Sequence, residues 1–176
     1  MNRLLYETPF GTLLLIVQKQ ELIYCNWISP ECDRKLLAIE REATKRLGEN
    51  DIENLQLEQE EEIAILKKAE LQLKEYFEST RRSFDLPLSF HGSLFQKKVW
   101  KELANINWGE TISYKELARR IGNENAARAV ASACGANPLC ILVPCHRVIA
   151  SNGGIGGYTG GVDKKASLLS LETKLT

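Results

Sequence analysis

A cysteine followed by a histidine and an arginine, in Pro144-Cys145-His146-Arg147, is the stretch of the sequence best suited to chemistry. A thiolate is a strong nucleophile, and neighbouring cationic or basic groups favour it over the thiol. Cys145 is therefore a candidate nucleophile, and His146 and Arg147 are neighbours that could lower the pKa of its thiol. A structural cysteine beside a surface histidine gives the same local sequence, so the pair needs support from its surroundings.

The apolar run over residues 139–143 predicts a buried strand in which Cys140 is an inert core residue. Pro144 lacks a backbone donor and would end that strand, which places Cys145 at the strand end. Neighbouring side chains of a strand point to opposite faces. We therefore expect His146 to act on Cys145 through a bridging water.

A glycine-rich segment follows, with six glycines in residues 152–161. Such a backbone can lie very close to a ligand, although a flexible surface loop has the same composition. The segment fits neither the phosphate-binding loop nor the dinucleotide fingerprint. A final helix is expected over residues 163–171, with Glu172 at its end.

Two Ser-x-x-Gln/Glu patterns, which begin at Ser93 and Ser113, predict capping boxes at two helix starts. The second helix should end at Gly122, and another is expected over residues 126–136. Helix, short turn and helix is the helix-turn-helix arrangement. Nearly all side chains of 126–136 are small, and Arg128 is its one long cation. These small residues suit close approach to DNA and tight core packing equally well.

The first half has a different pattern. Apolar runs at 12–17 and 22–27, separated by polar residues, predict a β-hairpin. A helical stripe follows, made of Leu66, Ala69, Leu73 and Tyr76/Phe77. The acidic segment 49–62 is expected to be a solvated loop or a helix start, and 84–92 a linker. We predict two domains, 1–88 and 93–176.

The net charge of zero conceals an asymmetry. Residues 1–92 carry 12 basic and 17 acidic side chains, a net −5, whereas residues 93–176 carry 11 and 6, a net +5. A basic half suits a polyanionic partner. The sequence has no secretion signal and no apolar run of membrane-spanning length, so we expect a cytoplasmic protein without a membrane partner.

The cysteine count bears on disulfides and metals. Five cysteines without a secretion signal argue against a disulfide framework. Cys25, Cys32 and His91 lack a fourth ligand and a standard spacing, so we expect no structural metal.

Several motifs, in order over residues 93–172, resemble those of the O6-alkylguanine-DNA alkyltransferases. They are Ile112-Ser113-Tyr114, Ala126-Ala127-Arg128-Ala129-Val130, Asn137-Pro138, Pro144-Cys145-His146-Arg147-Val148-Ile149 and Tyr158-Thr159-Gly160-Gly161. The first half is similar only in its hairpin and size. The resemblance implies an α/β N-terminal domain with a ribonuclease H-like sheet and helices, then a mainly α C-terminal domain with a winged helix-turn-helix. Family members often carry a cationic residue where Gly135 stands.

The resemblance also implies DNA repair by direct reversal. O6-alkylguanine is flipped from duplex DNA and its alkyl group passes once, irreversibly, to Cys145, with O4-alkylthymine as a possible minor substrate. The implied catalytic residues are Cys145, His146 (a base through water), Glu172 (holding His146), Asn137 (bracing the turn) and Tyr114 (rotating the nucleotide and donating to guanine N3). DNA contacts fall to Arg128, which enters the base stack, and to Ala126, Ala127, Ala129 and Ser113. The implied base pocket is made of Val148, Tyr158, Thr159 and Gly156. No cofactor is implied, and a monomer is expected.

Two other hypotheses remain at this point. A cysteine hydrolase would use Cys145 and His146 but leave the helix-turn-helix unexplained. A DNA-binding regulator without catalysis would leave Cys145, His146 and Glu172 without a role.

Overall fold

The first half is built on a three-stranded antiparallel sheet with the order β1-β2-β3. The computed structural model describes residues 1–28 and 52–173. The strands are β1 (Asn2–Thr8), β2 (Gly11–Gln18) and β3 (Glu21–Trp27). The predicted hairpin, β2–β3, is confirmed and turns at Lys19 and Gln20, both with positive φ. β1 was not predicted, because it contains few apolar residues. In the structure, every second residue of β1 is partly buried and the residues between them are exposed.

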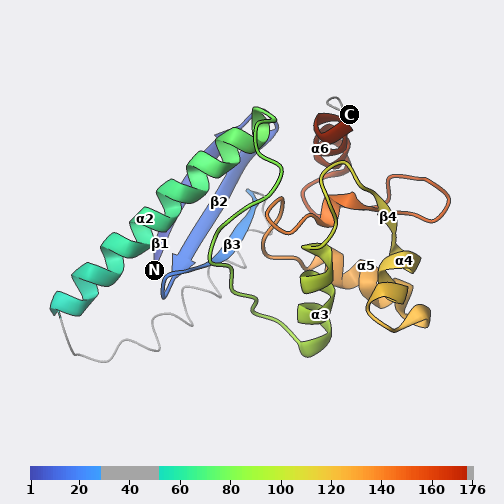
Figure 1. Cartoon of the computed structure of the whole chain (residues 1–176), viewed down its shortest axis with the longest axis horizontal. Coiled ribbons are helices and arrows are strands. Elements are labelled where there is room, and N and C mark those ends of the chain that lie inside the picture. Colours follow the sequence, from blue (N-terminus) through green and yellow to red (C-terminus); the bar gives the residue numbers. More distant parts are fainter. Residues whose placement is uncertain (29–51, 174–176) are drawn as a thin grey trace.

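Helix α2 (Ile52–Phe77) lies across one face of this sheet (Figure 1). The predicted stripe is confirmed, since Leu66, Ala69, Leu73 and Tyr76 are all buried. The acidic segment is a helix start from Ile52 onward, and residues 49–51 lie outside the described residues. Its Glu62 is buried rather than solvated and accepts hydrogen bonds from Asn2 Nδ2 (2.9 Å) and Lys19 N (2.7 Å).

The segment predicted as a linker packs along the first half. Leu22 N donates to Pro87 O (2.7 Å), and Ser89 N donates to Leu22 O (3.0 Å). The chain after α2 therefore runs beside β3 before it enters the second half.

The second half is mainly helical, as expected. Its helices are α3 (Leu94–Leu103), α4 (Tyr114–Arg120), α5 (Ala127–Gly135) and α6 (Val162–Thr173), with 3₁₀ turns η1 (Glu124–Ala126) and η2 (Cys145–Arg147). The short strands β4 (Ile112–Ser113) and β5 (Val148–Ile149) pair in parallel. The Ser93 capping box is complete. At Ser113 the hydroxyl accepts from Glu116 N, whereas the Glu116 carboxylate binds Arg119 and Arg120 instead of returning to the cap.

The two halves share one buried core. At their junction Cys25 N donates to Pro138 O (2.8 Å) and Cys140 N donates to Cys25 O (2.7 Å). The segment after α5 thus pairs with the last strand of the first half. Among the described residues, no helix combines the length and the apolar character that crossing a membrane requires.

Candidate active site

The segment before Cys145 is a series of tight turns, so the predicted strand over residues 139–143 is wrong. Ile141 has a positive φ of 71°, Leu142 N donates to Cys140 O and Val143 N donates to Leu139 O. Of this run, Leu139 alone forms a strand bridge, to Cys25. The burial that the apolar composition predicts is present, but a strand is not the only way to bury five apolar residues.

Asn137 explains why the run turns. Its side-chain amide donates to Val143 O (2.8 Å), and its Oδ1 accepts from Leu139 N (3.0 Å). The amide thereby occupies backbone groups that a neighbouring strand would otherwise pair. Asn137 is itself buried, and its carbonyl accepts from Asn26 Nδ2 of β3 (3.3 Å).

Cys145 consequently opens the 3₁₀ turn η2 rather than ending a strand. With about three residues per turn, the side chains of Cys145, His146 and Arg147 leave the backbone in three directions. The expectation of opposite faces therefore does not apply. All three residues are buried, and His146 is completely so.

A pocket of about 570 Å³ opens onto Cys145. Its lining residues are Tyr114, Ala131, Cys134, Gly135, Cys145, Gly157, Tyr158 and Thr159. The structure therefore brings Tyr114, Tyr158 and Thr159 together with the cysteine. Gly157 stands where Gly156 was expected, and Val148 is not part of the lining. Sequence reasoning did not assign Ala131, Cys134 and Gly135 to the pocket, although all three lie on the small-residue helix.

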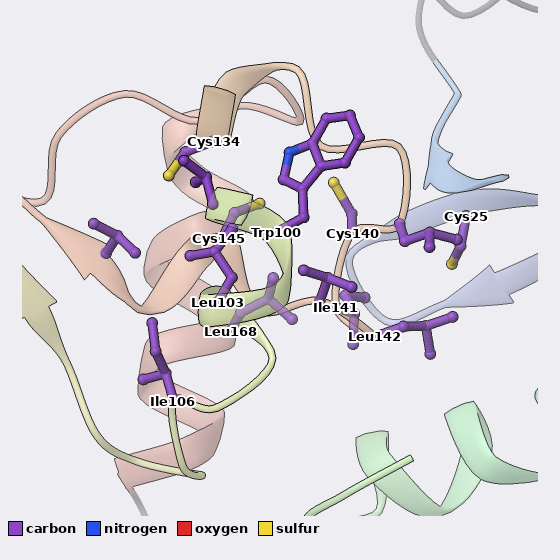
Figure 2. Packing of buried hydrophobic residues seen from close by; sticks show 14 of the residues in the cluster. Cys25, Trp100, Leu103, Ile106, Cys134, Cys140, Ile141, Leu142, Cys145 and Leu168 are labelled. Atoms are coloured by element: carbon purple, nitrogen blue, oxygen red, sulfur yellow. The ribbon is translucent and has the colours of Figure 1, made fainter. Parts of the chain in front are cut away.

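Cys145 lies in a buried cluster that also holds Cys134 and Cys140 (Figure 2), and the groups around it favour its thiolate. A hydrogen bond from Cys140 lowers the pKa of the Cys145 thiol, and Asn137 and the Lys165 ammonium act in the same direction. Together they outweigh burial, which raises that pKa. Cys140, which the sequence predicts to be an inert core residue, is buried as expected and neighbours Cys145. Its own pKa is raised well above the usual value, first through its hydrogen bond to Cys145.

The other described cysteines are held as thiols. Burial raises the pKa of Cys25 to about 12, and it also raises that of Cys134, with the nearby Cys145 as a further cause. Among the four cysteines that the structure describes, only Cys145 has a lowered pKa. Cys32 lies outside the described residues, and the described residues contain no His/Cys/Asp/Glu cluster suited to a metal ion.

Glu172 binds His146, which is the contact that the family resemblance implied. Nε2 of His146 lies 2.8 Å from Glu172 Oε1, and Nδ1 is buried without a hydrogen-bond partner among the described residues. If Nε2 carries the proton for the carboxylate, Nδ1 presents the lone pair of the neutral ring. Burial lowers the pKa of His146 and outweighs the carboxylate, which raises it. Glu172 lies within the last turn of α6, at the end of the expected helix.

Arg147 binds the same carboxylate. Its Nε and Nη2 donate to Glu172 Oε2 and Oε1, each at 2.9 Å, and Nη1 donates to Ile106 O. Burial raises the pKa of Glu172, but the hydrogen bonds from His146 and Arg147 together lower it well below its usual range. Sequence reasoning treated Arg147 as a neighbour of the thiol; the structure places its guanidinium on Glu172.

Lys165 was missed from the sequence. It is fully buried, and its Nζ donates to the carbonyls of Val148 (2.6 Å) and Gly157 (3.2 Å). Nζ also lies 5.9 Å from the Tyr114 ring centroid. One signal was available: Lys165 is three residues from Leu168 and seven from Glu172, which places it on the buried face of α6.

The small residues of α5 were interpreted as suited to core packing or to close approach to DNA, and the two faces of the helix differ accordingly. Val130, Ala133 and Cys134 are buried, and Ala133 O accepts from the indole N–H of Trp100 (2.8 Å). Arg128, Ala129, Ser132 and Gly135 are exposed, while Ala126 and Ala127 are half-buried. One face packs in the core, and the other offers Arg128 among small residues. Ser113 serves as the cap of α4.

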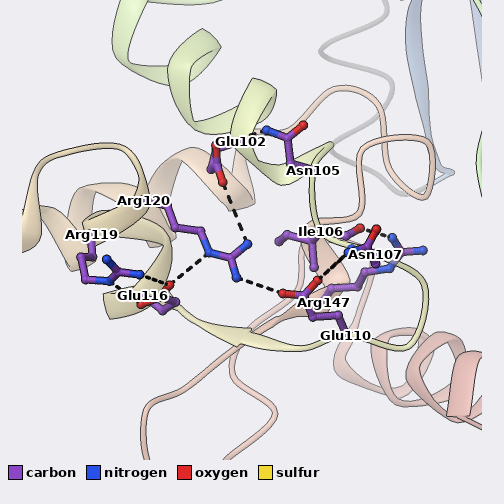
Figure 3. Close-up of polar contacts among 9 residues, drawn as sticks. All are labelled: Glu102, Asn105, Ile106, Asn107, Glu110, Glu116, Arg119, Arg120 and Arg147. Carbon is purple, nitrogen blue, oxygen red and sulfur yellow. Dashed lines mark hydrogen bonds and ion pairs between the residues drawn. The ribbon is translucent and has the colours of Figure 1, made fainter.

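An ion-pair network fixes α4, which begins at Tyr114 (Figure 3). The Arg120 guanidinium reaches Glu110 (2.9 Å), Glu116 (3.1 Å) and Glu102 of α3 (4.0 Å). The Arg120 guanidinium therefore links α4 to α3 and to the turn before β4. Tyr114, at the start of α4, lines the pocket.

Known families and structures match both halves of the chain. The family model "6-O-methylguanine DNA methyltransferase, ribonuclease-like domain" matches residues 1–90, and "6-O-methylguanine DNA methyltransferase, DNA binding domain" matches residues 94–174. A methylated-DNA--protein-cysteine methyltransferase of Methanosarcina acetivorans is 38% identical over 168 residues, 96% of each chain. The crystal structure of the Mycobacterium tuberculosis O6-methylguanine methyltransferase is 32% identical with a TM-score of 0.76, covering 99% of this chain and 94% of that one. A crystal structure of Mycobacterium tuberculosis OGT in complex with DNA gives 32% and 0.74, covering 96% and 90%.

Proposed function

The chain belongs to the 6-O-methylguanine DNA methyltransferase family, and we propose on that basis that it repairs DNA by taking the alkyl group of O6-alkylguanine onto Cys145. The observation that carries this assignment is the position of Cys145. It is the described cysteine with a lowered pKa, and it lines the pocket beside α5. O4-alkylthymine is proposed as a minor substrate, and the protein is proposed to act as a monomer in the cytoplasm.

The transfer is an in-line displacement at the alkyl carbon. A bond forms between Cys145 Sγ and that carbon while the bond from the carbon to guanine O6 breaks, and its electron pair stays with the base. The Tyr114 hydroxyl gives its proton to guanine N3, so the base leaves neutral, and the proton that leaves the Cys145 thiol makes up this loss. Burial, and then negative charge on the nearby sulfurs of Cys134 and Cys145, raises the pKa of Tyr114 to about 12, so this hydroxyl is protonated and available as a donor at neutral pH. The product is a stable thioether, so each molecule acts once.

The proton of the Cys145 thiol passes through a water to Nδ1 of His146, and Glu172 holds the ring in place. This is the arrangement of nucleophile, base and orienting group seen in other nucleophilic sites. Three observations support it: the free Nδ1, the 2.8 Å contact between Nε2 and Glu172, and the Asn137 hydrogen bonds that fix the turn before Cys145.

DNA is proposed to meet the exposed face of α5. The small residues Ala126, Ala127 and Ala129 allow the backbone to approach closely, and Arg128 enters the stack that the flipped nucleotide leaves. Extrusion of a base costs a few kcal/mol, less for a poorly paired one, and an inserted guanidinium offsets part of it. The flipped base then occupies the pocket between Tyr114, Tyr158 and Thr159.

The test is incubation with duplex DNA that carries O6-methylguanine, followed by peptide mass mapping. We expect one methyl group per molecule, on Cys145, and none in Cys145→Ala. Cys134 and Cys140 serve as internal controls, because their raised pKa values keep them as thiols near the same pocket. A methyl group on another cysteine contradicts the proposal. Repeated turnover would support a cysteine hydrolase instead, and DNA binding without an adduct would support a regulator.

A further inference from the structure

The Glu172 carboxylate also receives a hydrogen bond from the other half of the chain. The Tyr76 hydroxyl, at the end of α2, donates to Oε1 at 2.8 Å. The same oxygen faces Nε2 of His146 and Nη2 of Arg147, and Gly109 N donates to Oε2 at 3.3 Å. Among the described residues, every other donor to this carboxylate comes from residues 109–147, so Tyr76 is the contribution of the first half.

Packing alone does not require this hydroxyl. Tyr76 is fully buried on the inner stripe of α2, with its ring edge-on to Trp108 (5.2 Å between centroids) and tilted against Phe84 (5.5 Å). A phenylalanine would supply the same aromatic contacts. The hydroxyl is the part of the side chain that reaches the proposed active site, and a buried phenol needs such a partner.

We propose that Tyr76 is a positioning residue for the alkyl transfer. Its hydroxyl sets how much negative charge Oε1 of Glu172 presents to His146. The inference rests on the proposed function. A donor to Oε1 takes up part of its negative charge. Without that donor the oxygen interacts more strongly with a protonated imidazole, so the pKa of His146 rises. Tyr76 therefore keeps His146 neutral, and able to accept the thiol proton, down to a lower pH.

Other charges around this carboxylate do not replace the hydroxyl. Arg147 of η2 occupies both carboxylate oxygens, and Lys165 of α6 acts on His146 in the same sense as Arg147, lowering its pKa. Both cations remain in a Tyr76→Phe variant. Arg147 holds Glu172 ionised and in place, so the variant isolates the effect of one hydrogen bond.

The experiment compares the full-length wild type with Tyr76→Phe at two levels. The chain has only two histidines, so NMR titration of their rings separates His146 from the exposed His91. We expect a higher pKa for His146 in the variant and an unchanged His91. In repair of O6-methylguanine DNA, the acidic limb of the pH–rate profile should move to higher pH, and the maximal rate should fall roughly three- to ten-fold.

Tyr6→Phe is the matched control. Tyr6 also packs its ring against Phe77, 6.5 Å between centroids, but it lies on β1 outside the site. It should move neither the His146 titration nor the acidic limb. The proposal is overturned if Tyr76→Phe leaves both unmoved, even when it destabilises the fold. A wild type that transfers no methyl group contradicts the proposed function instead, and the NMR titration still decides what Tyr76 does to His146.

Discussion

Arg128 is the long cation on the exposed face of α5, where neighbouring side chains are small. If Arg128 fills the gap in the base stack after base flipping, it assists the extrusion of the nucleotide and not the transfer of the alkyl group to Cys145. Arg128→Ala should then slow repair of duplex DNA by about ten-fold or more, because the cost of extrusion is no longer offset. Reaction with free O6-methylguanine base should change little. Single-turnover rates on the two substrates provide the measurement.

The control for Arg128→Ala is Arg82→Ala, which removes an exposed arginine from the segment after α2. It should leave both rates unchanged. Equal slowing of duplex and free-base reactions by Arg128→Ala would contradict a role in flipping and point to a disturbed pocket.

At the same scale, the sequence predicts the reacting residues better than their partners. The roles of Cys145, His146 and Glu172 are implied by the family resemblance. Tyr76, Cys140 and Lys165 do not, because each looks like an ordinary core or helix residue until the fold brings it to the site. Their roles depend on contacts over long sequence separations, such as the 96 residues between Tyr76 and Glu172. Burial alone was predictable for Tyr76, from its helical stripe.

At the scale of elements, ion pairs within α4, between Glu116 and the two arginines Arg119 and Arg120, contribute to the stability of this helix. Hydrogen bonds from Arg119 and then Arg120 lower the pKa of Glu116 to about 2 from the usual 4.5. A carboxylate whose pKa is depressed on folding stabilises the fold above its unfolded pKa, and this stabilisation is lost as the pH falls through the folded pKa. Glu116→Gln should therefore lower stability above pH 5, modestly because the pairs are exposed, and the difference should vanish near pH 2.

Urea unfolding of both proteins between pH 2 and pH 7 measures this difference. Glu60→Gln, at an exposed position of α2, is the control and should run parallel to the wild type. A constant gap between Glu116→Gln and the wild type at all pH values would mean that the side chain acts through packing and not through its charge.

Elements with a regular period were predictable, and the segment that carries Cys145 was not. The hairpin, the α2 stripe and the Ser93 cap each arise from local patterns of sequence. Residues 139–143 have the composition of a strand, but the Asn137 amide and the left-handed Ile141 turn the chain instead. The backbone groups of residues 139–143 form hydrogen bonds with the Asn137 side chain and with one another in turns, and hydrophobic periodicity does not encode such bonds.

At the scale of the whole molecule, the difference in net charge between the two halves indicates which half faces DNA. Two of the basic residues of the second half, Arg147 and Lys165, are buried and bind Glu172 and backbone carbonyls. Arg119 and Arg120 are held in ion pairs with Glu116, whereas exposed basic side chains such as Arg128 remain for phosphates. If this half alone faces DNA, a cation added beside α5 should strengthen binding, whereas one added to the first half should not.

Gly135 is the place to add that cation. It is exposed at the end of α5, and a Cβ there would meet only Thr159 Oγ1, at an ordinary 3.6 Å. Gly135→Lys should tighten binding to undamaged duplex DNA and steepen the plot of log K against log salt by about one, the signature of one more phosphate contact. Leu71→Lys, on the exposed face of α2, changes the net charge equally and should leave the slope unchanged. Fluorescence anisotropy across a salt series measures both. Equal steepening in the two variants would show that DNA senses the overall charge, and that the first half also faces it.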